Sequence, residues 1–269
     1  MDIFDSVVLG LVQGITEFLP ISSSGHLILV RDLLSIDATN ALAYDAVLHL
    51  STTLAVIVYF RNDLWVLIQA MLRKLGRLPV NQKDLTLFYA LAIGTVPAVI
   101  LGVALEPFFD KNTQSTGLVA LMLFMASVFF MYVEWRYYLR PTHGTVTAKR
   151  GFLVGLFQAL ALLPGFSRSG ATIAGGMMLG MSRYEASRFS FLLAIPITLG
   201  VGCKKSIDLL QNGGSVDWGV ILIGAGVAAV TAFIVIHFFL AFIRRYTLWP
   251  FIWYSVILSA LVGYVSLIS

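Results

Sequence analysis

Three ionisable side chains, Glu17, His26 and Arg168, interrupt apolar segments of the sequence, and each lies near a cluster of serines. Glu17 follows a run of eleven uncharged residues and precedes Ser22-Ser23-Ser24-Gly25-His26, whereas Arg168 lies within Ser167-Arg168-Ser169-Gly170. Inside a membrane an unpaired arginine costs from about 2.5 to more than 10 kcal/mol, so its presence needs a reason. A carboxylate, an imidazole and a guanidinium that come together can bind an anion and carry out acid–base chemistry.

The two serine clusters are each followed by glycine, at points where a new half-helix is expected to begin. Hydroxyl groups and free backbone N–H groups at a helix N-terminus form a site for anions. A single cluster is more typical of a simple N-cap, but two clusters joined by Arg168 favour a phosphate or carboxylate ligand. The alternative is a structural ion pair between Arg168 and Glu17 that pins the two segments together.

Other polar residues recur at helical spacing. Gln13 and Glu17 are four residues apart, so a helix presents both on one face, and their oxygens suit a hard cation such as Mg²⁺ or Ca²⁺. His26 fits two interpretations: a core histidine satisfied by a carbonyl group, or a general acid–base group or nucleophile that works with Glu17. Asp45 and His49 also share a helix face, and we favour a local polar pair over a second layer around the site.

The composition excludes most classes of soluble protein. Of the 269 residues, 58% are apolar and 12% are charged, against roughly 45–50% and 25% in soluble domains. The single cysteine excludes a disulfide scaffold within the chain. The basic residues are dispersed and form no face with interleaved aromatic residues, so no nucleic acid partner is expected. The sequence predicts an all-α polytopic membrane protein with lipid around most of its surface.

About six segments are long and apolar enough to span a bilayer, which takes about 20 helical residues. Two further segments, 6–30 and 151–182, are broken near their middle by proline, glycine and serine, so we expect each to form a re-entrant pair of half-helices. The expected spans are 42–60, 85–105, 112–133, 186–203, 218–243 and 246–269.

An internal repeat relates the two broken segments. A shift of 145 residues aligns Gly10 with Gly155, Gln13 with Gln158, Ser22 with Ser167, Ser24 with Ser169, Gly25 with Gly170 and Thr53 with Thr198. We infer one membrane domain, 1–269, built from repeat 1 (about 1–140) and repeat 2 (about 150–269). Each repeat contributes three spans, an odd number, so the repeats are expected to be inverted.

The basic residues indicate the orientation. Most follow the first, third and fifth spans, which predicts that these loops are cytoplasmic and that both termini lie outside. Arg31, Lys111, Lys204 and Lys205 are exceptions on the other side. The residues that carry the prediction are Arg61, Arg73, Lys74, Arg77, Lys83, Arg136, Arg140, Lys149, Arg150, Arg244 and Arg245.

Three motifs resemble a known family. Gln13-Gly-Ile-Thr-Glu17 resembles the (E/Q)xxxE motif, and the segment from Pro164 to Thr172 resembles the PGxSRSxxT motif, of the bacitracin-resistance type undecaprenyl-diphosphate phosphatases. The resemblance extends over the whole chain and includes Pro20-Ile-Ser-Ser-Ser-Gly-His26. Many members have glutamate at the first motif position, where this chain has Gln13.

The resemblance implies a bacterial inner-membrane enzyme that hydrolyses undecaprenyl diphosphate to undecaprenyl phosphate and inorganic phosphate, with a site open to the periplasm. It implies Mg²⁺ or Ca²⁺ at Glu17 and Gln13, and it is compatible with a homodimer. A lipid transporter and a non-catalytic scaffold are the alternatives. The catalytic residues implied are Glu17, His26, Ser23 and Arg168, and the phosphate-binding residues are Ser22, Ser24, Ser167, Arg168, Ser169, Gly170 and Thr172.

Overall fold

The described part of the chain is helical. A computed structural model describes residues 1–36, 41–109, 116–212 and 217–268, in which one isolated backbone bridge joins Gly144 and Met181. The helices are α1 (Ile3–Thr16), α2 (Ser23–Leu34), α3 (Ala41–Tyr59), α4 (Arg61–Leu75), α5 (Gln82–Phe109), α6 (Thr116–Leu139), α7 (Ala148–Ala159), the 3-10 helix η1 (Leu160–Leu162), α8 (Arg168–Met178), α9 (Arg183–Asn212), α10 (Trp218–Ile243) and α11 (Trp249–Ile268).

The expected all-α membrane fold is confirmed. Helices α5, α6, α9, α10 and α11 are each long and apolar enough to cross a membrane, and α3 with α4 brings the number of candidate spans to six. Large apolar side chains such as Leu222, Phe238 and Ile257 face outward, as expected for a surface in contact with lipid. The start of the expected span 112–133, Ser269 and the predicted topology exception Lys111 lie outside the described residues.

Helix α4 was not expected, because residues 61–83 were interpreted as a loop. The structure bends by 75° between α3 and α4, at a point where the apolar run ends in Phe60 and Arg61. Helix α4 buries Leu67 and Ala70 on one side and exposes basic residues in its last turn. Its amphipathic pattern does not meet the criterion of a mostly apolar segment long enough to span a bilayer, which is the criterion that predicted the other helices.

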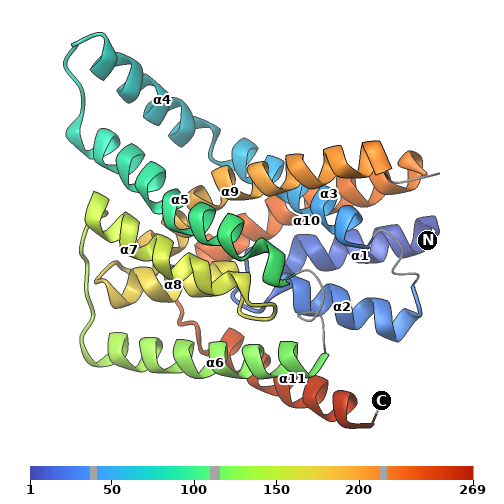
Figure 1. Ribbon diagram of the computed structural model, residues 1–269. Helices are drawn as coiled ribbons and strands as arrows, with labels where there is room; N and C mark the ends of the chain where they lie inside the picture. The colour runs from blue at the N-terminus through green and yellow to red at the C-terminus, as the bar shows by residue number, and fades with distance from the viewer. Residues whose placement is uncertain (37–40, 110–115, 213–216, 269) are drawn as a thin grey trace.

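Both broken segments form pairs of half-helices, as expected. Helix α1 has 14 residues and α8 has 11, which corresponds to about 21 and 17 Å, too short for a bilayer core of about 30 Å. The pairs α1–α2 and α7–α8 occupy opposite halves of the molecule, and the loop that joins each pair faces the middle (Figure 1). The residues at positions 17–22 and 163–167 therefore meet inside the protein.

The two halves pack through equivalent contacts. Helix α1 packs against α10 where Gly10 lies on the backbone of Gly224, and α7 packs against α5 where Gly155 lies on the backbone of Gly94. A side chain at Gly10 or Gly155 would collide with the partner backbone, so glycine allows the close approach. Thr53 donates a hydrogen bond to Thr198, its own repeat partner, at 2.6 Å. This contact joins α3 to α9 at a pair of positions that the predicted repeat aligns.

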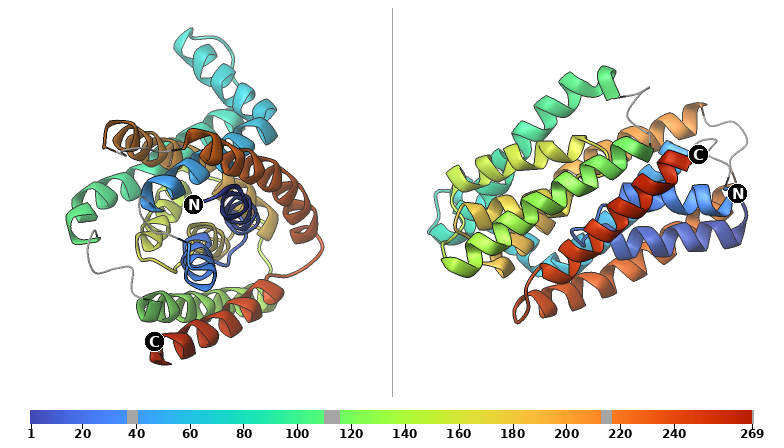
Figure 2. Two further views of the ribbon diagram at one scale, coloured as in Figure 1. Left: turned by 90° about the vertical axis from the view of Figure 1, so that its right-hand side faces the viewer. Right: turned by 90° about the horizontal axis from the view of Figure 1, so that it is seen from below.

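The largest buried cluster holds the hairpin loops in place. Phe18, next to Glu17, is 1% exposed and packs edge-on against Phe191 of α9, with 5.1 Å between the ring centroids. Ile173 and Leu192 are also fully buried in this cluster. The N- and C-termini lie at one end of the molecule, and the α6–α7 and α10–α11 connections lie at the other (Figure 2).

Candidate active site

Glu17 is the centre of a hydrogen-bond network where the two hairpin loops meet. The residue caps the C-terminus of α1 and is 6% exposed. Its Oε1 accepts a hydrogen bond from Arg168 in the other hairpin. Its Oε2 accepts hydrogen bonds from Ser23 Oγ at 2.7 Å and from Gln13 Nε2 at 3.0 Å. The structure therefore brings together Gln13, Glu17, Ser23 and Arg168, whereas His26, which was expected to meet Glu17 and Arg168, has other hydrogen-bond partners.

The Glu17–Arg168 pair is placed against the helix dipoles. Glu17 lies at the C-terminal end of α1 and Arg168 is the first residue of α8, so each charge faces the unfavourable end of its helix. Arg168 Nη1 is buried and finds no hydrogen-bond partner among the residues that the structure describes. A purely structural pair would leave this donor unsatisfied at a cost of about 1–3 kcal/mol, so the site has an unused donor for an anion.

Ser22 and Ser167 turn the chain at the two hairpin loops. Both have a positive φ, 67° and 50°, which is uncommon for serine and marks local strain. Their hydroxyls accept hydrogen bonds from the N–H groups of Gly25 and Gly170, so the N-cap interpretation is correct for these two residues.

The remaining hydroxyls differ in their surroundings. Ser24 Oγ lies 3.4 Å from Ser22 Oγ, and Ser169 Oγ donates a hydrogen bond to the Leu19 carbonyl at 2.9 Å, which joins the two loops directly. Thr172 is fully buried, and its hydroxyl lies 2.5 Å from Ser190 Oγ on α9. This environment favours packing between α8 and α9 over the phosphate contact predicted for Thr172.

Gly170 is required by the close approach of α6. A Cβ atom at this position would collide with the ring of Phe130. Its backbone N–H serves the cap of α8, since it donates to Ser167 Oγ at 3.2 Å. The predicted phosphate-binding role of Gly170 therefore competes with this capping bond.

His26 is held by two hydrogen bonds and is 9% exposed. Its Nδ1 lies 2.7 Å from the Ser22 carbonyl oxygen, and its Nε2 lies 2.7 Å from the Tyr254 hydroxyl. A carbonyl oxygen only accepts, so Nδ1 carries the hydrogen and Nε2 offers a lone pair to Tyr254. The expected carbonyl contact is confirmed, whereas the partner at Nε2 is Tyr254 and not Glu17.

Two residues of this network were not predicted correctly from the sequence: Tyr254 was missed, and His49 was assigned to the wrong partner. Tyr254 lies 228 residues from His26 in an apolar span, and no spacing signal connects them. His49 Nδ1 lies 2.8 Å from Gln13 Nε2 and 3.1 Å from Glu17 Oε2, while Asp45 pairs with Arg31. The favoured local pair between Asp45 and His49 is therefore wrong, and His49 belongs to the second layer around the site.

The oxygen atoms near Glu17 fit a divalent cation only in part. Gln13 Oε1 is buried beside the Glu17 carboxylate, and no residue in the described ranges forms a hydrogen bond with it. Among the described residues, no group of three or more His, Cys, Asp or Glu side chains is arranged to hold a metal ion. The chain thus offers one carboxylate and one free amide oxygen, a set that suits Mg²⁺ when substrate phosphates complete the coordination.

Comparison with known proteins adds to this geometry. A family model described as "Bacitracin resistance protein BacA" matches residues 6–261, which include both hairpins and the spans between them. The chain belongs to the BacA family. A relative from Trichlorobacter lovleyi is 41% identical over 262 residues, which cover 95% of this chain and 94% of the relative. A relative from Alteromonas mediterranea is 37% identical over 260 residues, 97% of each chain.

Both BacA relatives are named undecaprenyl-diphosphatase, as is a third from Alcanivorax borkumensis, which is 40% identical over 263 residues and covers 96% of this chain and 97% of its own. The match extends along nearly the whole length of these proteins. The resemblance inferred from the hairpin motifs is thus confirmed at the level of the family, and the protein is a multi-pass membrane member of it.

Proposed function

We propose that this protein hydrolyses undecaprenyl diphosphate to undecaprenyl phosphate and inorganic phosphate. Membership of the BacA family and the names of its relatives support this activity. The observation that carries the proposal is the contact of a potential nucleophile, Ser23, with the buried carboxylate of Glu17, beside the unpartnered Nη1 of Arg168. The diphosphate enters between the hairpin loops while its isoprenyl chain stays among the apolar helices.

Ser23 is the nucleophile of this proposal. Its Oγ attacks the terminal phosphorus while its proton passes to Glu17, and the bridging P–O bond breaks to release undecaprenyl phosphate. Water then attacks the phosphoserine, and Glu17 returns the proton to Ser23 Oγ as inorganic phosphate leaves. Arg168 and the N-terminal N–H groups of α2 and α8 stabilise the charge on the transferred phosphoryl group.

His26 lies one turn after Ser23 on α2, with its Nε2 lone pair oriented by Tyr254. In this account the Tyr254 hydroxyl rotates away in the second step, Nε2 of His26 accepts the proton of the attacking water, and this proton then passes to solvent. Tyr254 is a positioning residue, because it fixes the ring that receives this proton and does not itself contact the phosphate.

Replacing Tyr254 with phenylalanine should lower kcat about five- to tenfold and leave KM unchanged, because it removes one hydrogen bond from His26 and keeps the ring. Steady-state phosphate release measures both constants. The matched control is Tyr264→Phe, an exposed tyrosine further along α11, which should behave as wild type. Equal effects of the two changes, or a loss explained by a lower Tm alone, would contradict a positioning role.

We also propose that Mg²⁺ or Ca²⁺ binds at Glu17 and Gln13 together with the substrate. When bound, the cation would neutralise part of the diphosphate charge. The free Oε1 of Gln13 supports this assignment. Arg168, which forms an ion pair with Glu17, would neutralise a further part of the diphosphate charge.

Gln13→Glu tests the cation. A second carboxylate beside Glu17 should lower the Mg²⁺ concentration for half-maximal activity about tenfold, because it adds charge to the coordination shell. The rate at saturating Mg²⁺ should be preserved, because Glu17 itself is unchanged. Gln69→Glu adds the same charge on the exposed side of α4 and should leave the Mg²⁺ dependence unchanged. An identical Mg²⁺ curve for Gln13→Glu would argue that Gln13 only orients Glu17.

The proposed location is the inner membrane of a bacterium, with the site open to the periplasm. The grouping of basic residues after alternate spans supports this orientation. A reporter that is active only in the cytoplasm should therefore be active after Thr145, between α6 and α7, and silent at the C-terminus. The reverse pattern would exclude the orientation.

The purified protein tests the function itself. It should release inorganic phosphate from undecaprenyl diphosphate in detergent or in liposomes, with many turnovers per molecule. A transporter would move the lipid between leaflets without phosphate release, and a scaffold would do neither. Size measurements of the same preparation will establish whether it is the homodimer that the sequence left open.

A further inference from the structure

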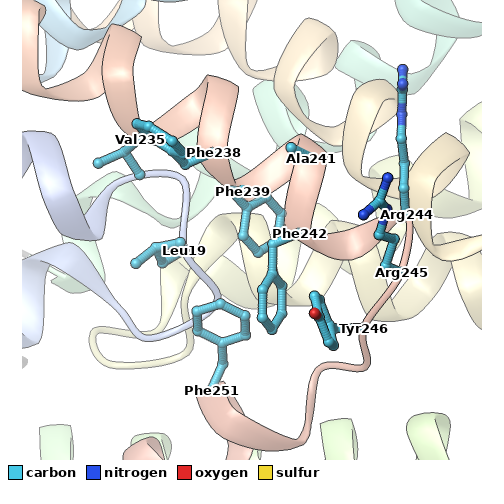
Figure 3. Close-up of a pocket in the computed structure, with 10 residues that line it drawn as sticks. All are labelled: Leu19, Val235, Phe238, Phe239, Ala241, Phe242, Arg244, Arg245, Tyr246 and Phe251. Atoms are coloured by element: carbon cyan, nitrogen blue, oxygen red, sulfur yellow. The ribbon is translucent and has the colours of Figure 1, made fainter.

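A groove between α10 and α11 lies outside the hydrolytic network. It has a volume of about 780 Å³ and is lined largely by the rings of Phe238, Phe239, Phe242 and Phe251, with Arg244 and Arg245 at one end. The arginines and Leu19 of the first hairpin lie at opposite ends of this group of side chains (Figure 3). The groove therefore has a long apolar wall and a cationic end.

The apolar wall is ordered by ring packing. The centroid of Phe251 lies 5.4 Å from that of Phe239 and 5.6 Å from that of Phe242, and Phe242 stacks on Tyr246 at 4.8 Å. Phe239 is buried, whereas Phe238 is 66% exposed at the rim. Because positions 235–242 form the last two turns of the 26-residue span α10, this wall lies in the part of the hydrocarbon region next to the arginines and suits an acyl chain.

The cationic end of the groove offers positive charge to a ligand. Arg244 and Arg245 follow directly after the last residue of α10, so they lie where an apolar span reaches the membrane surface. Arg244 is held by the Tyr184 hydroxyl at 2.7 Å, and its guanidinium lies 4.3 Å from the centre of that ring. Within the part of the chain that the structure describes, the Arg245 side chain makes no hydrogen bond or ion pair. None of the described residues that line the groove is Asp or Glu.

We propose that this groove binds an anionic phospholipid of the surrounding bilayer. The phosphate of the head group lies between Arg244 and Arg245, and one acyl chain follows the phenylalanine wall toward Leu19. Basic pockets between membrane helices recognise anionic head groups in this way. The two arginines favour a lipid with a net negative charge over a zwitterionic lipid. The apolar wall favours a molecule with an acyl chain over free phosphate.

The far end of the groove connects the bound lipid to the hairpin. Leu19 is two residues after Glu17, and its carbonyl oxygen accepts the hydrogen bond from Ser169 that joins the two loops. A chain seated against Leu19 therefore packs on the segment that holds these loops together. We expect an anionic phospholipid to raise the Tm of the protein.

Lipid binding to the full-length protein in detergent, followed by native mass spectrometry and by Tm, tests the proposal. Phosphatidylglycerol should bind at least tenfold more tightly than phosphatidylcholine with the same acyl chains. Arg244→Gln with Arg245→Gln should weaken phosphatidylglycerol binding about 30-fold, because each basic residue near a membrane surface contributes about 1 kcal/mol. Arg136→Gln with Arg140→Gln removes two exposed charges from the end of α6 and should change nothing.

A second arm tests the apolar wall. Ala241→Trp should fill the groove and weaken phosphatidylglycerol binding at least tenfold while both arginines remain. Inorganic phosphate alone should neither raise the Tm nor compete with the lipid. Equal binding of the two lipids, equal losses in the two double variants, or competition by inorganic phosphate would each overturn the proposal. None of these readouts depends on hydrolysis of a diphosphate.

Discussion

Replacing Glu17 with glutamine should reduce phosphate release from undecaprenyl diphosphate about 1000-fold. The change keeps the size of the side chain, but it replaces one acceptor oxygen with an NH₂ group and removes the base that takes the proton of Ser23 at 2.7 Å. It also removes the charge that pairs with Arg168. The rate should be measured per folded molecule, with Tm recorded for the same sample.

Glu134→Gln is the matched control for Glu17→Gln. Glu134 is also fully buried, and it pairs with Arg183 through two hydrogen bonds of 3.1 and 2.5 Å, on α6 and α9. Its replacement should lower the Tm, because it weakens a buried ion pair, while the rate per folded molecule stays within about twofold of wild type. If Glu17→Gln behaved in the same way, Glu17 would be structural and the proposed base would be wrong.

Arg168→Lys should lower activity about 100-fold with little change in Tm. Lysine keeps a positive charge for Glu17, but it loses the planar fork whose buried Nη1 has no partner in the structure. The lost interactions are charge-assisted hydrogen bonds to phosphate, each worth about 1.5–3 kcal/mol. Steady-state rates and Tm of the purified variant distinguish this effect from unfolding.

Arg183→Lys provides the comparison for Arg168→Lys. Arg183 donates to Glu134 from Nε and Nη2 and stacks over the ring of Tyr137 at 4.3 Å, so lysine there should cost stability and not rate. The same substitution should thus lower the rate at Arg168 and lower the Tm at Arg183. Full activity in Arg168→Lys would favour the simple charge pair that the sequence left open.

Much of the fold could be predicted because a membrane imposes a small number of strict rules on the sequence of the chain that crosses it. Spans appear as uncharged runs, and the hairpins appear as runs broken by Pro, Gly and Ser. The predicted repeat rests on identities at a shift of 145 residues, such as Gly10 with Gly155, and one pair that this shift aligns, Thr53 and Thr198, is in contact. The contact between Glu17 and Arg168 followed from the cost of leaving either charge unpaired in lipid.

The remaining features depend on tertiary contacts that a local pattern does not encode. Tyr254 is one of many aromatic residues in apolar spans, and only the packing of α11 brings its hydroxyl to His26. His49 was assigned to Asp45 because the two share a helix face, but Arg31 satisfies Asp45 from another helix. Helix α4 was missed because a search for apolar segments that span a bilayer passes over an amphipathic helix with several charged residues.

The identity of the attacking atom tests the account most directly. Undecaprenyl diphosphate with a radioactive terminal phosphate should be mixed with the purified enzyme, quenched within milliseconds and digested, with parallel acid and alkaline quenches. The account predicts acid-stable label on the peptide that contains Ser23, and no label in Ser23→Ala. Label on His26, stable in alkali and lost in acid, or a wild-type rate in Ser23→Ala, would contradict it.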